Sequence, residues 1–437
     1  MLRYRNNIFF INDSLENKIS YYHLLFFLIV LPFDRFYSEI ILISYAAHTI
    51  IHLNKKKIKG IFTLQTLILT SAFFVNLIGT VYSPDKKPAF NDMERQLAIF
   101  LFPVLVSASG LKLAAHRDAL LKVFGFTCVI TVLYLFIYSF RLIAYNHLPV
   151  SNLFSTFFTN HNFSAPVEMH ATYLSMYICL SLISYLFFFL KEKTGNYKIF
   201  YGICILILLA GLMQLASRAV FISTLFIILV LYPLFIEKGA SRSKFLMIVF
   251  PIILVAFIGI YRIDWFRKRY ISELRNDLTQ VSINNDIIEP RISRWRVAWK
   301  LFQQNPLLGY GSGTEKKILM ENYFEKKLYN SYLNKLNAHN EYLSIMLKTG
   351  IWGLLVYLFM LIYGYIAAWY NRDIVFAGFV SLIAFVSFSE NILDVNKTIF
   401  FYSFFFSLFI YSSKNLLPVN TIFKAKKKTV IAKNNSF

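Results

Sequence analysis

Four basic side chains stand at the ends of apolar segments, although they come from distant parts of the chain. They are Arg95 in MERQLAIFLFP, Arg218 in QLASRAVF, Arg291 in PRISRWRVAW and His339 in AHNEYLSIMLKTG. A guanidinium is a planar fork of donors that fits phosphate oxygens. A neutral imidazole can accept a proton from a hydroxyl. If the four meet at one face, they predict binding of a polyanion or pyrophosphate beside a base.

Each position also has a structural interpretation. Arg291, with Arg294 and Arg296, suits cations that reach toward lipid headgroups from an apolar helix. Arg95 beside Glu94 and Arg218 between two apolar segments suit salt bridges or headgroup anchors, although a cation within an apolar stretch is usually functional. A lone histidine is more often structural than catalytic. The convergence of the four favours the functional interpretation.

Three further residues are candidates for contacts with an acceptor or a sugar. His170 opens the apolar segment EMHATYLSMY, with Glu168 two residues before it, and Asn340 follows His339 directly. A hydroxyl-rich ligand needs donors and acceptors of this kind.

Motifs for metals and nucleotides do not fit. His339 is followed by Asn-Glu, but no second histidine lies four residues on, and the three cysteines show no metal spacing. The glycines of GYGSGT, Gly309 to Thr314, match neither a dinucleotide-binding fingerprint nor a phosphate-binding loop. We interpret them as a tight turn that ends a helix, with a secondary role of letting a substrate approach the backbone. The sequence predicts no metal and no cofactor.

The elements that must position these residues are membrane segments. The chain has 437 residues, of which 57% are hydrophobic and only 16% charged, against about 25% charged in a typical soluble domain. A helix needs about 20 apolar residues to cross the hydrocarbon core. Twelve apolar stretches are candidates, the first of them short: 21–33, 36–53, 61–82, 96–111, 119–143, 169–190, 198–215, 219–236, 244–262, 341–369, 374–392 and 398–413. The composition excludes a soluble enzyme, a disordered chain and a coiled coil, and predicts an all-α polytopic membrane protein.

The charges between the segments predict the orientation. The net charge is +22, and most of the excess lies in every second gap, as in KKKIK, KEKTGNYK and EKGASRSK, and in the tail KAKKK. Basic loops mark the cytoplasmic side, so both termini are expected there, and nucleic acid is not an expected partner. The four basic candidates then share the outer face.

Two expected outer segments are long, 144–168 and 263–340. A loop of such length is usually functional, and ISRWRVAWKLFQ repeats apolar residues at helical spacing. We therefore divide the chain into 1–262 with nine membrane helices, 263–340 as an outer loop with helices, 341–413 with three more membrane helices, and 414–437 as a basic cytoplasmic tail.

The order of these motifs resembles the O-antigen ligase and O-antigen polymerase superfamily of bacterial inner-membrane proteins. The resemblance rests on Arg291–Trp295, the turn NPLLGYGSGT, the segment AHNEYLSIMLKTGIWGLL, SRA at 217–219 and the stretch 94–103. It covers about 291–355 and those two shorter pieces, and elsewhere only the hydrophobic layout agrees.

The resemblance implies about twelve transmembrane helices with a large periplasmic loop, of the GT-C-like membrane glycosyltransferase type. It implies a glycan donor on undecaprenyl pyrophosphate and an acceptor that is a lipid A-core or another glycan. Membrane lipids are further expected partners. Arg291 and Arg218 would bind the pyrophosphate, with Arg95 a further candidate, and His339 would activate or orient the acceptor hydroxyl. No carboxylate pair is evident on the outer face, so we expect metal-independent and inverting transfer.

Other functions remain open. An O-antigen or capsule polymerase would use the same donor with a second lipid-linked glycan, and a protein O-oligosaccharyltransferase would modify side chains. A lipid or glycan transporter would place charges deep in the bundle and break helices near the midplane. Here the charges gather at the outer surface, which argues against a transporter. The loop pattern and the single pairing of an arginine with a histidine favour the ligase.

Overall fold

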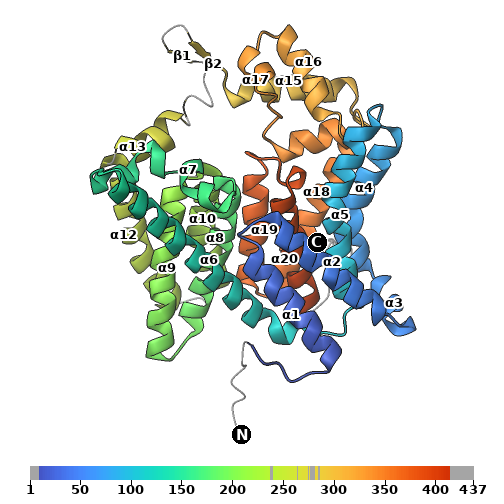
Figure 1. Ribbon diagram of the computed structural model, residues 1–437, viewed down its shortest axis with the longest axis vertical. Helices are drawn as coiled ribbons and strands as arrows, with labels where there is room; N and C mark the ends of the chain where they lie inside the picture. Colours follow the sequence, from blue (N-terminus) through green and yellow to red (C-terminus); the bar gives the residue numbers. More distant parts are fainter. Residues whose placement is uncertain are drawn as a thin grey trace, which may run out of the picture.

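The computed structural model describes residues 9–236, 240–262, 264–273, 275, 281–283 and 286–413. Almost all of the secondary structure in these residues is helical (Figure 1). The described strands, β1 (Val281–Ile283) and β2 (Asp286–Ile288), pair antiparallel as one short hairpin. The expected all-α class is therefore confirmed. The tail expected at 414–437 and part of the gap at 237–244 lie outside the described residues.

A helix occupies each of the twelve stretches that the sequence singled out. These helices are α1 (Leu15–Val30), α2 (Arg35–Ile51), α4 (Leu64–Tyr82), α5 (Lys86–Ala108), α6 (Leu113–Tyr145), α8 (Ala171–Lys191), α9 (Gly195–Leu215), α10 (Arg218–Phe226) continuing into α11 (Tyr232–Phe235), α12 (Ala240–Arg262), α18 (Glu341–Tyr370), α19 (Ile374–Val386) and α20 (Asn396–Ser412).

Six described helical stretches are long and apolar enough to cross a membrane: 64–82, 113–145, 171–191, 195–215, 218–235 and 341–370. The chain is thus consistent with a polytopic membrane protein. The number twelve stays a prediction, because some of the other helices are short; α19, for example, has 13 residues.

The core of the bundle lies around α20 and α8, whose side chains are buried on nearly all sides. Phenylalanines supply much of the packing, since the Phe379 ring on α19 contacts the rings of Phe401, Phe405 and Phe409 on α20. A helix that is apolar all round is a buried or membrane helix. The unbroken apolar sequences of α8 and α20 predict helices of this kind.

One end of the bundle is covered by the segment expected as the outer loop. Helices α15 (Arg291–Gln304), α16 (Glu315–Glu325) and α17 (Tyr329–Leu333) lie together beyond the end of α18 (Figure 1). Leu301, Leu319 and Leu347 belong to one apolar core that joins α15, α16 and the first half of α18. That first half therefore packs with the outer unit rather than with the membrane bundle alone.

The helix α18 is interrupted at Gly350, whose φ of 66° and ψ of −158° are not helical. The turn after α15 fills the gap, because the N–H groups of Tyr310 and Gly311 donate to the carbonyls of Leu347 and Lys348 at 2.8 and 2.9 Å. This satisfies carbonyls that the broken helix leaves unpaired. GYGSGT is therefore a turn after a helix, as expected. The glycines let the turn approach the backbone of α18, because a Cβ at Gly309 would collide with the Leu347 carbonyl.

The opposite end of the bundle joins two gaps that the charge pattern assigns to the cytoplasm. Arg117 lies in the charged first turns of α6, which belong to one of these gaps. It forms an ion pair of 2.6 Å with Asp373, which caps the start of α19. The expected inner gaps thus meet at one end, and the outer segments meet at the other.

Candidate active site

A cavity of about 460 Å³ lies where the outer segments meet the bundle. Arg218, Arg291, His339 and His170, four of the residues singled out by sequence, all line it. They come from α10, α15, the segment before α18 and the segment before α8. The remaining polar lining is His161, Thr172, Ser217, Arg269, Ser389 and Glu390.

Three arginines give this cavity its positive charge. Arg291 begins α15 and donates from Nη1 to the Ser389 carbonyl at 2.9 Å, which holds the guanidinium against the link after α19. Arg218 begins α10 directly after a turn in which Ala216 has a φ of 47°. Arg269 donates to the Ala216 carbonyl at 3.4 Å and pairs with Glu273. One turn between α9 and α10 therefore brings Arg218 and Arg269 to the same wall.

Four helices also begin at this cavity. Arg218 and Arg291 are the first residues of α10 and α15, His170 caps the start of α8, and His339 lies two residues before α18. The amino-terminal end of a helix carries a partial positive charge. Together with the arginines, these ends make the cavity suited to an anion such as a phosphate.

The His339 ring is held by a carboxylate. Its Nδ1 lies 3.3 Å from Oε2 of Glu390, and Glu390 is 6% exposed. Burial alone would raise the pKa of Glu390, but the hydrogen bond from His339 and the nearby charge of Arg291 bring it below its usual value. An ionised carboxylate accepts the proton of Nδ1, which leaves Nε2 free to accept a proton from a ligand.

Two further histidines pair at the same cavity. The rings of His161 and His170 lie 4.2 Å apart, centre to centre. Desolvation lowers the pKa of His170 to about 4, and desolvation followed by the charge of Arg269 lowers that of His161. The Thr172 N–H donates to Nδ1 of His170 at 3.3 Å. Neutral His170 therefore carries its proton on Nε2 and can donate it to a ligand oxygen.

The other sequence candidates lie elsewhere. Arg95 pairs with Asp92 at 2.5 Å and donates to the Asp394 carbonyl at 3.2 Å, next to a different cavity. Glu168 is exposed and outside the lining of the arginine cavity. Asn340 caps α18, since its Oδ1 accepts from the Leu343 N–H at 3.1 Å. The structure therefore does not bring these three side chains to the cavity that holds His339.

An apolar groove of about 750 Å³ continues from the arginine cavity, because Ile292, Trp295 and Phe388 line both. Arg296, Lys300 and Lys326 stand among its lining residues. An apolar floor with cationic groups suits the chain and headgroup of an anionic lipid.

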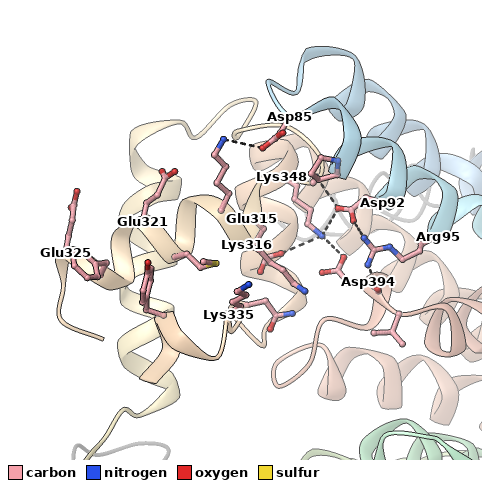
Figure 2. A pocket seen from close by; sticks show the side chains of 18 residues that line it. Asp85, Asp92, Arg95, Glu315, Lys316, Glu321, Glu325, Lys335, Lys348 and Asp394 are labelled. Carbon is pink, nitrogen blue, oxygen red and sulfur yellow. Dashed lines mark hydrogen bonds and ion pairs between the residues drawn. The ribbon is translucent and has the colours of Figure 1, made fainter. Parts of the chain in front are cut away.

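The face that is expected to lie outside also holds a group of carboxylates, which corrects the expectation that no carboxylate pair lies there. Asp92, Glu315 and Asp394 surround the ammonium of Lys348 at the floor of a cavity of about 1000 Å³ (Figure 2). They bind Lys348 and sit apart from the arginines. In the described part of the chain, no three His, Cys, Asp or Glu side chains are grouped as ligands for a metal ion.

Sequence reasoning missed Arg269, Glu390 and His161. Arg269 is one of many basic residues in the loop 263–340, so its type alone does not single it out. Glu390 lies in the short link SENILDVNK, where an acidic residue directly after an apolar stretch was a usable signal. His161 lies in 144–168, a segment almost without charge, and its distance from His170 along the chain hides the pair.

One family of known proteins matches part of the chain. Residues 203–358 match a family model described as O-antigen ligase, and this stretch contains Arg218, Arg269, Arg291 and His339. No curated protein matches the chain.

Proposed function

We propose that this chain, whose residues 203–358 match a family model described as O-antigen ligase, is a glycosyltransferase of the ligase type. It moves a glycan from undecaprenyl pyrophosphate to a sugar hydroxyl of a lipid A-core acceptor. The observation that carries this proposal is the cavity in which Arg218, Arg269 and Arg291 face the same space as His339.

The arginines bind the pyrophosphate of the donor. Their guanidinium groups and the four helix ends stabilise the charge that grows on the leaving group as the bond to the sugar breaks. Pyrophosphate leaves as a stable anion, so no general acid is needed at that oxygen. The apolar groove beside the cavity takes hydrocarbon from one of the lipid substrates.

His339 activates the acceptor. With Nδ1 hydrogen-bonded to Glu390, Nε2 takes the proton of the acceptor hydroxyl as its oxygen bonds to the anomeric carbon. The bond from that carbon to the pyrophosphate oxygen breaks in the same displacement, and the configuration inverts. Glu390 stabilises the imidazolium that forms.

The proposed setting is the bacterial inner membrane, with both termini cytoplasmic and the cavity facing the periplasm. The twelve helices span the bilayer in the manner of GT-C-like transferases, and residues 263–340 cover the outer end. The positive-inside pattern and the meeting of the inner gaps at Arg117 and Asp373 support this orientation.

The test removes the protein from its host and examines the lipopolysaccharide on a gel. Complementation uses the wild type, His339→Asn and His147→Asn. Both histidines have a positive φ, 47° and 52°, and asparagine tolerates that conformation. His147 is exposed and lies outside the cavity lining, so its variant controls for the substitution itself.

We expect core without attached glycan, and glycan accumulating on the lipid carrier, in the deletion strain and with His339→Asn, and a normal profile with His147→Asn. Core that bears a single repeat unit would instead indicate the polymerase. An unchanged profile in the deletion strain would refute the proposal.

A further inference from the structure

We propose that the charge cluster around Lys348 is a positioning device for His339. In this arrangement Lys348 holds the carboxylates of Asp92, Glu315 and Asp394 together. Glu315 itself, and Asn391 bonded to Glu315 and Asp394, fix the backbone on the two sides of His339. The inference rests on the proposed function for the role of His339 as a base. Lys348, Glu315 and Asn391 are positioning residues, because they lie behind His339 and do not line the arginine cavity.

The cluster is buried and closely packed. The Lys348 ammonium lies 2.5 Å from Oδ1 of Asp394 and 3.6 Å from both Asp92 and Glu315. The side chain of Lys348 is 8% exposed, and that of Glu315 only 3%. Arg95 adds a second cation by pairing with Asp92, as Figure 2 shows. The formal sum of the five side chains is −1, so each cation is needed to balance the carboxylates.

Glu315 and Asn391 connect the cluster to the segment that carries His339. The Glu315 carboxylate accepts from the Ala338 N–H at 3.2 Å, and the Ser344 hydroxyl also donates to it. The Asn391 amide nitrogen donates to Glu315 at 3.2 Å and to Asp394 at 3.0 Å. Its oxygen accepts from the Asn340 N–H at 2.9 Å. Both backbone neighbours of His339 are thereby tied to the cluster.

His339 needs such support because its backbone is strained. A φ of 47° is unfavourable for a residue with a Cβ, and it persists only where the surroundings fix it. The Trp295 indole N–H adds a third tie by donating to the Ala338 carbonyl at 3.0 Å. The ring meets Glu390, which directly precedes Asn391, so the same link aligns the base and its carboxylate.

Loss of the Lys348 charge would undo this arrangement. Three carboxylates around a buried position repel one another once their counterion is gone. Glu315 and Asp394 would separate or take up protons, and Asn391 would lose the fixed acceptors of its amide. The backbone around His339 would then relax. A displacement of about 1 Å in a catalytic group can cost about a hundredfold in rate.

The test compares variants of the full-length protein in lipid nanodiscs. Lys348→Met removes the central charge. Glu315→Gln weakens the tie to Ala338 without leaving an excess of negative charge, and so serves if Lys348→Met fails to fold. Lys317→Met is the matched control: Lys317 pairs with Asp85 at 3.3 Å at the same cavity, and its side chain is 65% exposed. Among the described residues, its ion pair is with Asp85 and not with the His339 segment.

Two readouts are needed. For Lys348→Met and Glu315→Gln we expect kcat to fall by at least about tenfold, while donor binding changes by less than about twofold. Hydrogen exchange at the Ala338 and Asn340 amides should accelerate in both variants and stay unchanged in Lys317→Met. Adding Asp92→Asn to Lys348→Met should restore part of kcat, because it removes one of the repelling carboxylates and leaves Ala338 and Asn340 untouched.

Unchanged exchange at both amides in Lys348→Met would overturn the proposal, as would faster exchange with normal kcat. The exchange readout also separates this inference from the proposed function. If His339→Asn proves fully active, the assignment of the base fails, while exchange at Ala338 and Asn340 still reports whether the cluster fixes the segment.

Discussion

A guanidinium and an ammonium carry the same charge, but they would not serve the arginine cavity equally. Arg291 donates from Nη1 to the Ser389 carbonyl, and its guanidinium lines the cavity. A lysine there has to choose between the carbonyl and the ligand, because its charge is a single point.

We therefore expect Arg291→Ala to lower transfer by about a hundredfold or more, and Arg291→Lys to recover less than about a tenth of the activity, since a charge-assisted pair is worth about 1.5–3 kcal/mol. Steady-state kinetics with a lipid pyrophosphate donor would measure this. Arg35→Ala is the control, because the Arg35 side chain is 65% exposed and lies outside the linings of the cavity and the groove. Full activity in Arg291→Ala would remove Arg291 from the site.

His170 should make the stability of the protein depend on pH. Its pKa in the folded protein is about 4, whereas an unfolded chain has about 6.5. Above pH 6.5 neither state binds the proton. As the pH falls from about 6.5 to about 4 the unfolded state alone takes it up, so stability declines over that interval.

His170→Asn keeps an acceptor at the start of α8 and removes this titration. Thermal unfolding at pH 7, 5.5 and 4 should therefore show a smaller loss of Tm in the variant than in the wild type. His161 and Glu390 still titrate in both proteins, so only the difference belongs to His170. Equal losses in the two proteins would contradict the prediction.

At the level of single residues, sequence identified the cations of the site better than their partners. Arg218, Arg291, His339 and His170 stand out because a polar group at the edge of an apolar run is costly. Arg95 stands out in the same way, yet Asp92, three residues before it, takes its charge. Glu390 and Arg269 become visible only when the links fold together, because their neighbours in space are far away in sequence.

At the level of elements, the apolar runs were sufficient to predict where helices lie. They predicted one continuous helix over 341–369, however, and the structure breaks it at Gly350. The break depends on a turn some forty residues earlier, which supplies donors to the carbonyls of Leu347 and Lys348. Hydrophobic periodicity carries no record of such a distant partner.

The break makes Gly350 sensitive to substitution. Its backbone lies in a region open almost only to glycine, and a Cβ would collide with the backbone of Leu307 and Leu308. We expect Gly350→Ala to destabilise the protein by about 3 kcal/mol or more. Thermal unfolding in detergent would measure it.

The control for this substitution is Gly195→Ala. Gly195 begins α9, and a Cβ there would meet nothing within 4 Å. Alanine at such a site should be neutral or stabilise by up to about 1 kcal/mol. If both variants unfold at the temperature of the wild type, the interruption of α18 does not need glycine.

For the whole molecule, the arrangement in the membrane is the prediction of widest reach. Labelling of single cysteines with a membrane-impermeant maleimide in spheroplasts tests it. Glu321→Cys in α16 should react and Lys193→Cys, in an expected cytoplasmic gap, should not. The native cysteines Cys128, Cys179 and Cys204 are buried and should give little background. Reaction at Lys193→Cys alone would invert the proposed topology.

The four helix ends at the arginine cavity have a consequence for how firmly its charge is fixed. An arginine can be lost by a single codon change, and a histidine changes charge with acidity. The partial charges of the backbone do neither, because they follow from the direction in which the helices run. Part of the attraction for a phosphate thus comes from the fold of the backbone. This part persists under any conditions in which α8, α10, α15 and α18 begin at the same residues.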